Sequence, residues 1–376
     1  MDVTFASSGA LSRAHYSIVR KVETAQSVNQ ADQFLALEAK AVHERLSRSS
    51  LSVKACKECL VMLMYISTTA SPGFLPPGSF DFALTHALNL VEAGKSIEDK
   101  RIGYLFCAEL MPTHHELRLM MVNTLRKDLE SGSPGRMCLA LDNIVTFANE
   151  DIVPAVQDAV LDLISHNYPH IRRRAVLALR SLAVFNPDLL SQSSGTIVAR
   201  LQDRNEAVVG SALIAAAQLP SSDPSFSNAR HVVNGLFSSI RISKNSAISL
   251  RVVHCLQGMG LSEGHVSFAI DLLNSFSSSR EPALLLGIFR LLSQQTPSKL
   301  MEAEKAQGTS CVGSIQNLLA SHDINDQYLY LACLTCIDPV VWAGTSPDRP
   351  LVLEGWEVEK IMQFLESPDD SIRKMV

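Results

Sequence analysis

The stretch HIRRRAVLALRSLAVFNPDLL, from His170 to Leu190, decides the fold class. Its apolar side chains recur at steps of three and four residues, at Ile171, Ala175, Ala178, Leu179 and Leu182. Such spacing places them on one face of an α-helix. Asn186 and Pro187 then predict the end of the helix, because proline lacks an amide hydrogen and pushes the residue before it out of the helical region.

This pattern, a polar turn and then a helix with an alanine at its first buried position, returns along the chain. Four alanines mark it, namely Ala140, Ala175, Ala212 and Ala332. Their spacings are 35, 37 and 120 residues, and the last equals three steps of 40. Two helices per unit at a period of about 35 to 45 residues are typical of HEAT-like and armadillo-like repeats. Alanine at these positions would let neighbouring helices approach closely.

We therefore predict an all-α protein, a right-handed α-solenoid of HEAT/armadillo-like helix pairs, with an irregular helical bundle as the alternative. Ser249–Met259 and Pro282–Leu292 fall where the intervening repeats are expected, and Ser367–Val376 resembles the start of another. The proline-rich segment 67–79 and the polar segment 218–230 are predicted loops. Residues 1–376 are expected to form a single trunk domain that continues beyond Val376, since no polar capping helix closes the array.

Composition limits the function. The chain of 376 residues is 47% apolar but only 6% aromatic, which favours helices packed on helices. Its net charge of −5 argues against a nucleic-acid-binding domain, which would be basic. The N-terminus lacks the apolar core of a secretory signal, and no apolar run reaches the length of about 20 residues that spans a bilayer. The sequence predicts a cytosolic protein whose contact with membranes is peripheral.

Two cysteine pairs resemble half-sites for zinc, in CKEC (Cys56, Cys59) and CLTC (Cys333, Cys336). More than 270 residues separate the pairs, and both lie in apolar helical runs rather than in turns that could converge four sulfurs. Buried, reduced cysteines are the better interpretation, and no metal is expected.

No catalytic motif is complete. Gly94, Lys95 and Ser96 resemble the end of a phosphate loop, but no strand precedes them. His114 and His115 are adjacent, so on a helix they would point to different faces and could not chelate a metal together. The glycine-rich segment 308–313 lacks the strand that a nucleophilic serine needs. We predict neither an enzyme nor a bound cofactor.

Two motifs carry a resemblance to a known family. KRIGYL (Lys100 to Leu105) and, further on, NTLRKDL (Asn123 to Leu129) resemble the paired signature of the adaptin trunk, the N-terminal part of the large subunits of adaptor-protein complexes. Within that family the chain most resembles the epsilon adaptin of the fourth complex. The signature residues are Lys100, Arg101, Gly103, Tyr104, Asn123, Lys127 and Asp128.

This resemblance implies a structural role in vesicle-mediated protein transport from the trans-Golgi network. The implied partners are a sigma-type small subunit, a mu-type medium subunit and a beta-type large subunit, together with an Arf-type small GTPase and a membrane rich in anionic phosphoinositides. The implied location is the cytoplasmic face of the trans-Golgi network and of coated vesicles, exchanging with the cytosol. The hinge and ear domain of the family are not seen in this chain. A HEAT scaffold of another class, such as a coatomer subunit or a phosphatase scaffold, is the alternative.

Two lysines are candidate contacts for anionic lipid headgroups. Lys54 and Lys57 lie one turn apart at the start of a predicted helix, in a trunk whose relatives bind membranes. A solvated repeat face is the simpler explanation of both lysines, as it is of Arg172, Arg173 and Arg174.

Overall fold

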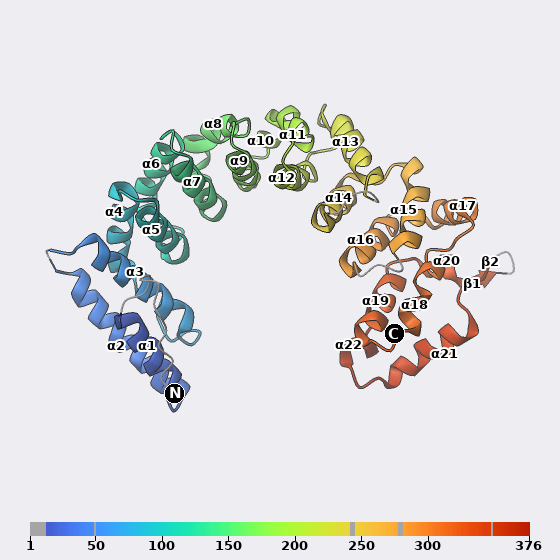
Figure 1. The fold of residues 1–376 in the computed structure, drawn as a ribbon, viewed down its shortest axis with the longest axis horizontal. Helices are drawn as coiled ribbons and strands as arrows, with labels where there is room; N and C mark the ends of the chain where they lie inside the picture. The colour runs from blue at the N-terminus through green and yellow to red at the C-terminus, as the bar shows by residue number, and fades with distance from the viewer. Residues whose placement is uncertain (1–12, 49, 241–244, 277–280, 347–348) are drawn as a thin grey trace. The chain divides into compact units, whose positions relative to one another are not determined.

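A computed structural model describes residues 13–48, 50–240, 245–276, 281–346 and 349–376. The chain divides into two compact units, Met1–Leu189 and Leu190–Val376. Each unit is a stack of helix pairs in two layers (Figure 1). The boundary between the units in the sequence falls within the short helix α10 (Asp188–Gln192). The helical-repeat class predicted from the sequence is confirmed.

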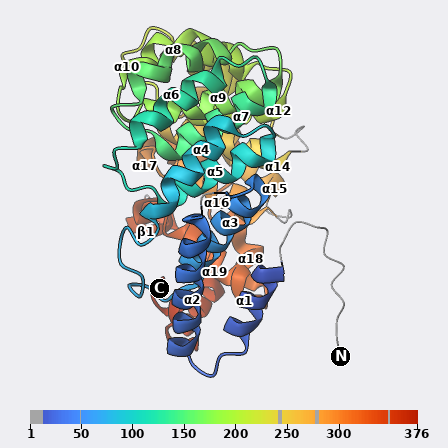
Figure 2. The ribbon, with the colours of Figure 1, turned by 90° about the vertical axis from the view of Figure 1, so that its left-hand side faces the viewer.

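In the first unit, successive helices alternate between two layers, and each helix packs on the next one of its own layer. One layer holds α3 (Val53–Thr69), α5 (Ile97–Leu110), α7 (Pro134–Phe147) and α9 (Pro169–Leu182). The other holds α4 (Leu84–Ala93), α6 (Arg118–Leu129) and α8 (Val153–Leu163), with the short 3-10 helix η1 (Asp81–Ala83) before α4. The pair α1 (Arg13–Glu23) and α2 (Val28–Leu46) precedes them, and α2 packs on α3 (Figure 2).

The second unit repeats this arrangement. One layer holds α12 (Glu206–Ala216), α14 (Ser246–Met259), α16 (Pro282–Leu292) and α19 (Ile324–Leu334). The other holds α11 (Ser194–Leu201), α13 (Phe226–Ser238), α15 (Glu263–Phe276) and α17 (Pro297–Gln307). The remaining elements are η2 (Gly313–Ile315), α18 (Gln316–Ala320), α20 (Pro339–Trp342), β1 (Ala343–Ser346), β2 (Arg349–Leu351), α21 (Gly355–Gln363), η3 (Phe364–Glu366) and α22 (Asp370–Arg373).

Helix α9 shows how the sequence produces a repeat. The helix begins at Pro169, whose fixed backbone angle suits a first turn, and ends at Leu182. All five apolar residues of the predicted stripe have no exposed surface. Each fully buried isoleucine or leucine of the stripe contributes roughly 1.5–3 kcal/mol to folding, and each alanine contributes less. Because α9 buries this stripe against α7 and α8, the repeat is stable only beside its neighbours.

Serine side chains fix the beginnings of several helices. Ser52 Oγ accepts a hydrogen bond from Ala55 N at 3.2 Å at the start of α3. At the start of α5, Ser96 Oγ accepts from Asp99 N at 3.1 Å while Ser96 N donates to the Asp99 carboxylate. These bonds satisfy amides that a helix leaves without partners at its N-terminus. The start of α5 is therefore well defined, and this positions the signature residues that follow.

Three details differ from the sequence predictions. Helix α3 continues through Thr69, so the predicted loop 67–79 begins three residues later than expected. Similarly, α13 begins at Phe226, inside the predicted loop 218–230. The strands β1 and β2 form an antiparallel hairpin, with Ala343 opposite Leu351, that was not predicted. Strands of four and three residues are too short for a readable alternation of apolar and polar side chains.

Within the described ranges, no helix combines the length and apolar character needed to cross a bilayer.

Candidate functional site

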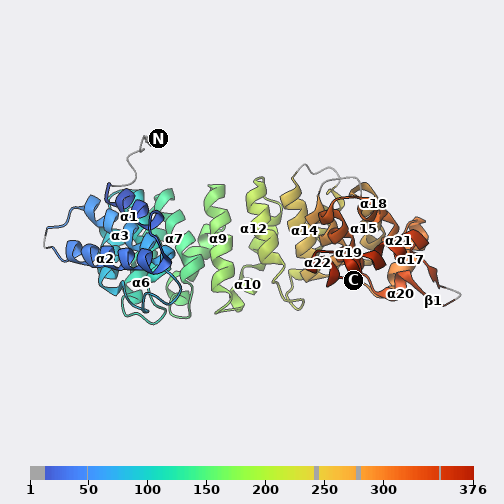
Figure 3. The same cartoon turned by 90° about the horizontal axis from the view of Figure 1, so that it is seen from below.

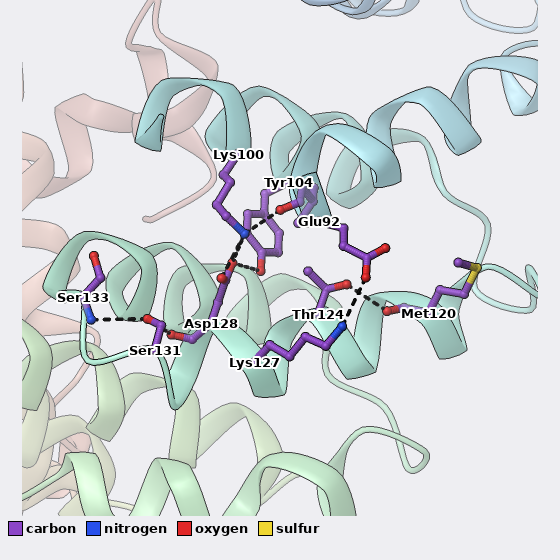
Figure 4. A network of polar contacts seen from close by, with 10 residues as sticks. Glu92, Lys100, Tyr104, Met120, Thr124, Lys127, Asp128, Ser131 and Ser133 are labelled. Carbon is purple, nitrogen blue, oxygen red and sulfur yellow. Dashed lines mark hydrogen bonds and ion pairs between the residues drawn. The ribbon is translucent and has the colours of Figure 1, made fainter. Parts of the chain in front are cut away.

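The two signature motifs meet through a buried ion pair between α5 and α6. Lys100 Nζ lies 2.9 and 3.0 Å from the two carboxylate oxygens of Asp128. The Tyr104 hydroxyl donates to Asp128 Oδ2 at 2.8 Å, and Lys100 also donates to the carbonyl oxygen of Val91 at 2.6 Å (Figure 4). Residues 28 positions apart in the sequence thus form one network that joins α4, α5 and α6.

Burial decides what this network can do. Lys100, Tyr104 and Asp128 are each 3% exposed. Burial is the main cause that raises the pKa of the Tyr104 hydroxyl far above its usual range, and the charge of Asp128 and the hydrogen bond to it act in the same direction. The hydroxyl therefore stays protonated and donates a hydrogen bond. A buried charge that loses its partner is strongly destabilising, whereas the intact pair satisfies both groups. The network therefore has a structural role and offers no reactive group to solvent.

Gly103 belongs to the same motif and lies where α5 passes very close to α4. A β-carbon at this position would lie 2.6 Å from the carbonyl oxygen of Ala87 and 2.6 Å from Val91 Cγ2. Only glycine allows the two helices to approach this closely. On the other side, Asn143 of α7 donates to the carbonyl oxygen of Tyr104 at 3.3 Å, which extends the network to a fourth helix.

The remaining signature residues lie on the surface. Arg101, Asn123 and Lys127 are all exposed. Lys127 forms an ion pair with Glu92 at 3.1 Å, in which both side chains are about half exposed (Figure 4). Exposed pairs of this kind contribute little to stability. The seven predicted residues thus divide into four that hold helices together and three that solvent can reach.

The two lysines proposed to bind lipid have different surroundings. Lys54 is exposed in the first turn of α3. Lys57 Nζ lies 2.5 Å from Asp99 Oδ1 of α5, in an ion pair whose carboxylate is mostly buried. The hydrogen bond from Lys57 is the main cause that lowers the pKa of Asp99. Lys57 is therefore engaged within the protein, and contact of either lysine with lipid stays a prediction.

Sequence reasoning missed Asp99 as a partner, although the capping pattern from Ser96 to Asp99 is readable. It also missed a second buried carboxylate, in the second unit. Glu357 has no exposed surface and accepts hydrogen bonds from Tyr330 OH at 3.1 Å, Gln316 Nε2 at 3.0 Å and the amide of Glu354 at 2.8 Å. These bonds join the start of α21 to α18 and α19. A polar residue in an exposed-looking helix gives no sequence signal for such a contact.

The repeat alanines are placed as follows. Ala140, Ala175 and Ala212 lie on α7, α9 and α12 and have no exposed surface. Ala332 lies on α19 but is partly exposed, and its neighbours Leu331 and Cys333 are buried instead. A direct role of the alanines in helix contact stays a prediction.

The two cysteine pairs that resemble zinc half-sites are free cysteines. Cys56, Cys59 and Cys333 are buried, and Cys336 is partly exposed. Burial raises the pKa of the Cys56 thiol to about 11, so it is neutral at physiological pH. Among the described residues, no group of three or more histidine, cysteine or acidic side chains could hold a metal ion.

The fold and these contacts define a helical-repeat scaffold, and comparison with known proteins gives its family. Residues 38–375 match the family described as adaptin N terminal region. The chain therefore belongs to the adaptin family. The resemblance read from KRIGYL and NTLRKDL is confirmed, and membership of this family supports the expectation of a non-enzymatic scaffold.

Relatives in this family include epsilon subunits of AP-4 complexes. The chain is 29% identical to AP-4 complex subunit epsilon-1 of Mus musculus over 196 residues, which are 52% of this chain and 17% of that protein. It is 25% identical to AP-4 complex subunit epsilon of Arabidopsis thaliana over 388 aligned positions, covering 96% of this chain and 38% of that protein. The chain thus spans less than half the length of these relatives.

A solved structure shares the fold. A homology model of the full-length AP-3 complex in an intermediate open conformation contains a chain that aligns with a TM-score of 0.58 at 18% identity. The alignment covers 86% of this chain and 54% of that one. At this identity the likeness concerns the fold alone.

Proposed function

We propose that this chain is the trunk of a structural large subunit of an adaptor-protein coat complex, acting in vesicle-mediated protein transport from the trans-Golgi network. The observation that carries the proposal is the match of residues 38–375 to the adaptin N-terminal region, supported by epsilon-type relatives. In this role the chain scaffolds a sigma-type small subunit, a mu-type medium subunit and a beta-type large subunit.

The physical basis is the surface that a two-layer repeat leaves free. Within each unit, the helices of the two layers pack on one another, and exposed residues lie along both layers. Successive helices of one layer therefore offer a continuous surface to a folded partner. A stable interface needs roughly 1,200–2,000 Å² of total buried area, which a few adjacent helices can supply. No bond is made or broken in such a role.

Membrane contact in this proposal is peripheral, on the cytoplasmic face of the trans-Golgi network and of coated vesicles. It uses exposed basic side chains such as Lys54, an Arf-type small GTPase and anionic phosphoinositides. The support is the location of Lys54 at the accessible end of α3.

Co-expression tests the proposal. The tagged chain is produced together with sigma-, mu- and beta-type subunits of the fourth adaptor complex, and the purified material is analysed by size-exclusion chromatography with light scattering. We expect the partner subunits in stoichiometric amounts. A matched experiment uses the catalytic subunit of a phosphatase that binds HEAT scaffolds. Recovery of the phosphatase subunit, and of none of the adaptor subunits, would overturn the adaptor role.

A further inference from the structure

A groove lies between α12 and α14 in the second unit, where the two helices run side by side (Figure 3). Its volume is about 530 Å³. This lies within the roughly 300–1,000 Å³ usual for sites that enclose a ligand or a few side chains. The lining residues are Leu213, Ile214, Ala217, Gln218, Ala247, Leu250, Arg251, His254 and Cys255.

The floor of the groove is apolar, and part of its wall consists of small side chains. Leu213 and Cys255 are fully or almost fully buried, while Ile214 and Leu250 are partly exposed. Ala217 and Ala247 leave space between the helices where longer side chains would fill it. Partly exposed aliphatic groups above a buried floor provide the surface that a bulky apolar side chain can cover.

Arg251 is a cation that lines the groove. The guanidinium of Arg251 lies over Gly210 of α12, where a β-carbon would lie 2.2 Å from Nη1. Among the residues that the structure describes, no carboxylate pairs with Arg251, and none lines the groove. Glu206, one turn before Gly210, accepts a hydrogen bond from Asn245 at 2.6 Å instead. His254, three residues after Arg251 on α14, also lines the groove and is exposed.

From this geometry we infer that the groove binds an amphipathic helix of a partner subunit in the coat complex. A bulky apolar side chain of that helix covers the floor between Ile214 and Leu250. A carboxylate one turn away pairs with Arg251. The inference rests on the proposed function, because it requires that partner subunits surround the chain.

The chemistry of the walls favours a helix over an extended peptide. Both walls are α-helices, whose backbone amides and carbonyls are bonded within the helix, so no free strand edge is available for pairing. Recognition must therefore use side chains, as when the apolar face of a helix lies in a groove. An arginine placed beside apolar surface selects a carboxylate by charge and by its paired donors.

Site-specific crosslinking tests the inference in the assembled complex. A photoreactive phenylalanine analogue replaces Ala247 in the groove or, as the control, His231 on the exposed side of α13. We expect Ala247 to crosslink to a helical segment of a partner subunit with an acidic and a bulky apolar residue one turn apart. The inference is wrong if Ala247 gives no adduct, or only adducts with basic or unstructured segments, in a complex that assembles normally.

A charge exchange then tests Arg251 itself. The crosslinked segment is made as a labelled peptide, and its binding to the whole chain is measured by fluorescence anisotropy. We expect Arg251→Glu to weaken binding at least about tenfold and Arg251→Lys to weaken it less. Replacing the peptide carboxylate by arginine should restore binding to Arg251→Glu. Unchanged binding to a folded Arg251→Glu protein would overturn the pairing, while failure of the subunits to assemble at all would count against the proposed function.

Discussion

At the scale of single residues, Asp128 has the largest predicted effect on stability. It is 3% exposed and accepts from both Lys100 and Tyr104. Asp128→Asn would leave the buried ammonium of Lys100 without a counter-charge. We expect a loss of about 3–5 kcal/mol in the free energy of unfolding. A fall of roughly 10 °C in the melting midpoint, followed by circular dichroism, would accompany it.

The chain offers a matched control one residue away. Lys127→Gln breaks the exposed pair with Glu92, and we expect a change of at most about 1 kcal/mol. If Asp128→Asn and Lys127→Gln lower the midpoint equally, the buried network is not what joins α5 to α6.

Asp99 gives a prediction about pH. The hydrogen bond from Lys57 lowers the pKa of this carboxyl in the folded protein below its ordinary value. A carboxyl with a lowered pKa stabilises the fold above the pKa of the unfolded chain, and this contribution is lost as the pH falls through the folded pKa. The melting midpoint of the wild type should therefore exceed that of Asp99→Asn at pH 7, and the difference should shrink below about pH 4. A difference independent of pH would contradict this.

The sequence indicated the signature residues but not which of them are buried and which are exposed. Lys100 and Lys127 look alike in KRIGYL and NTLRKDL, yet one is buried and the other exposed. The distinction depends on how α5 and α6 are rotated against each other, which periodicity of separate helices does not determine. The partnership of Lys57 with Asp99 was missed for the same reason, since it joins two helices far apart in the sequence.

At the scale of elements, the predicted roles of the repeat alanines can be compared directly. Ala175 is fully buried on α9, whereas Ala332 is partly exposed on α19. Ala175→Leu would force a larger side chain into a packed contact, and we expect it to cost about 1–3 kcal/mol. Ala332→Leu should change the unfolding free energy much less. Equal losses in urea titrations of the two variants would mean that burial of Ala175 does not set the helix approach.

Helices with strong periodicity were predictable, and short or long-range features were not. The stripe of α9 and the segment 282–292 of α16 were read correctly because apolar side chains repeat over three turns. The hairpin of β1 and β2 and the buried Glu357 gave no such pattern, since each depends on contacts made after the helices have packed.

At the scale of the whole molecule, we predicted a single trunk domain, and the structure divides into two compact units. The adaptin family match crosses the division, from residue 38 to residue 375, so one family region includes parts of both units. A repeat array makes this understandable, because each pair of helices depends on its neighbours and stability is distributed along the chain. Partner binding by one unit and membrane contact by the other unit can then be tested by separate substitutions in the intact protein.

The last of these tests concerns membrane contact by the first unit. Lys54 is exposed, while the charge of Lys57 is paired with Asp99. A basic residue near an anionic surface contributes about 1 kcal/mol, so Lys54→Ala should lower binding to phosphoinositide-containing vesicles about fivefold in flotation assays. The double variant Lys57→Gln with Asp99→Asn removes both charges of the pair and should leave flotation nearly unchanged. Raising the salt concentration should weaken wild-type binding and reduce the effect of Lys54→Ala. If Lys54→Ala floats like the wild type at low salt, this end of α3 does not contact the membrane.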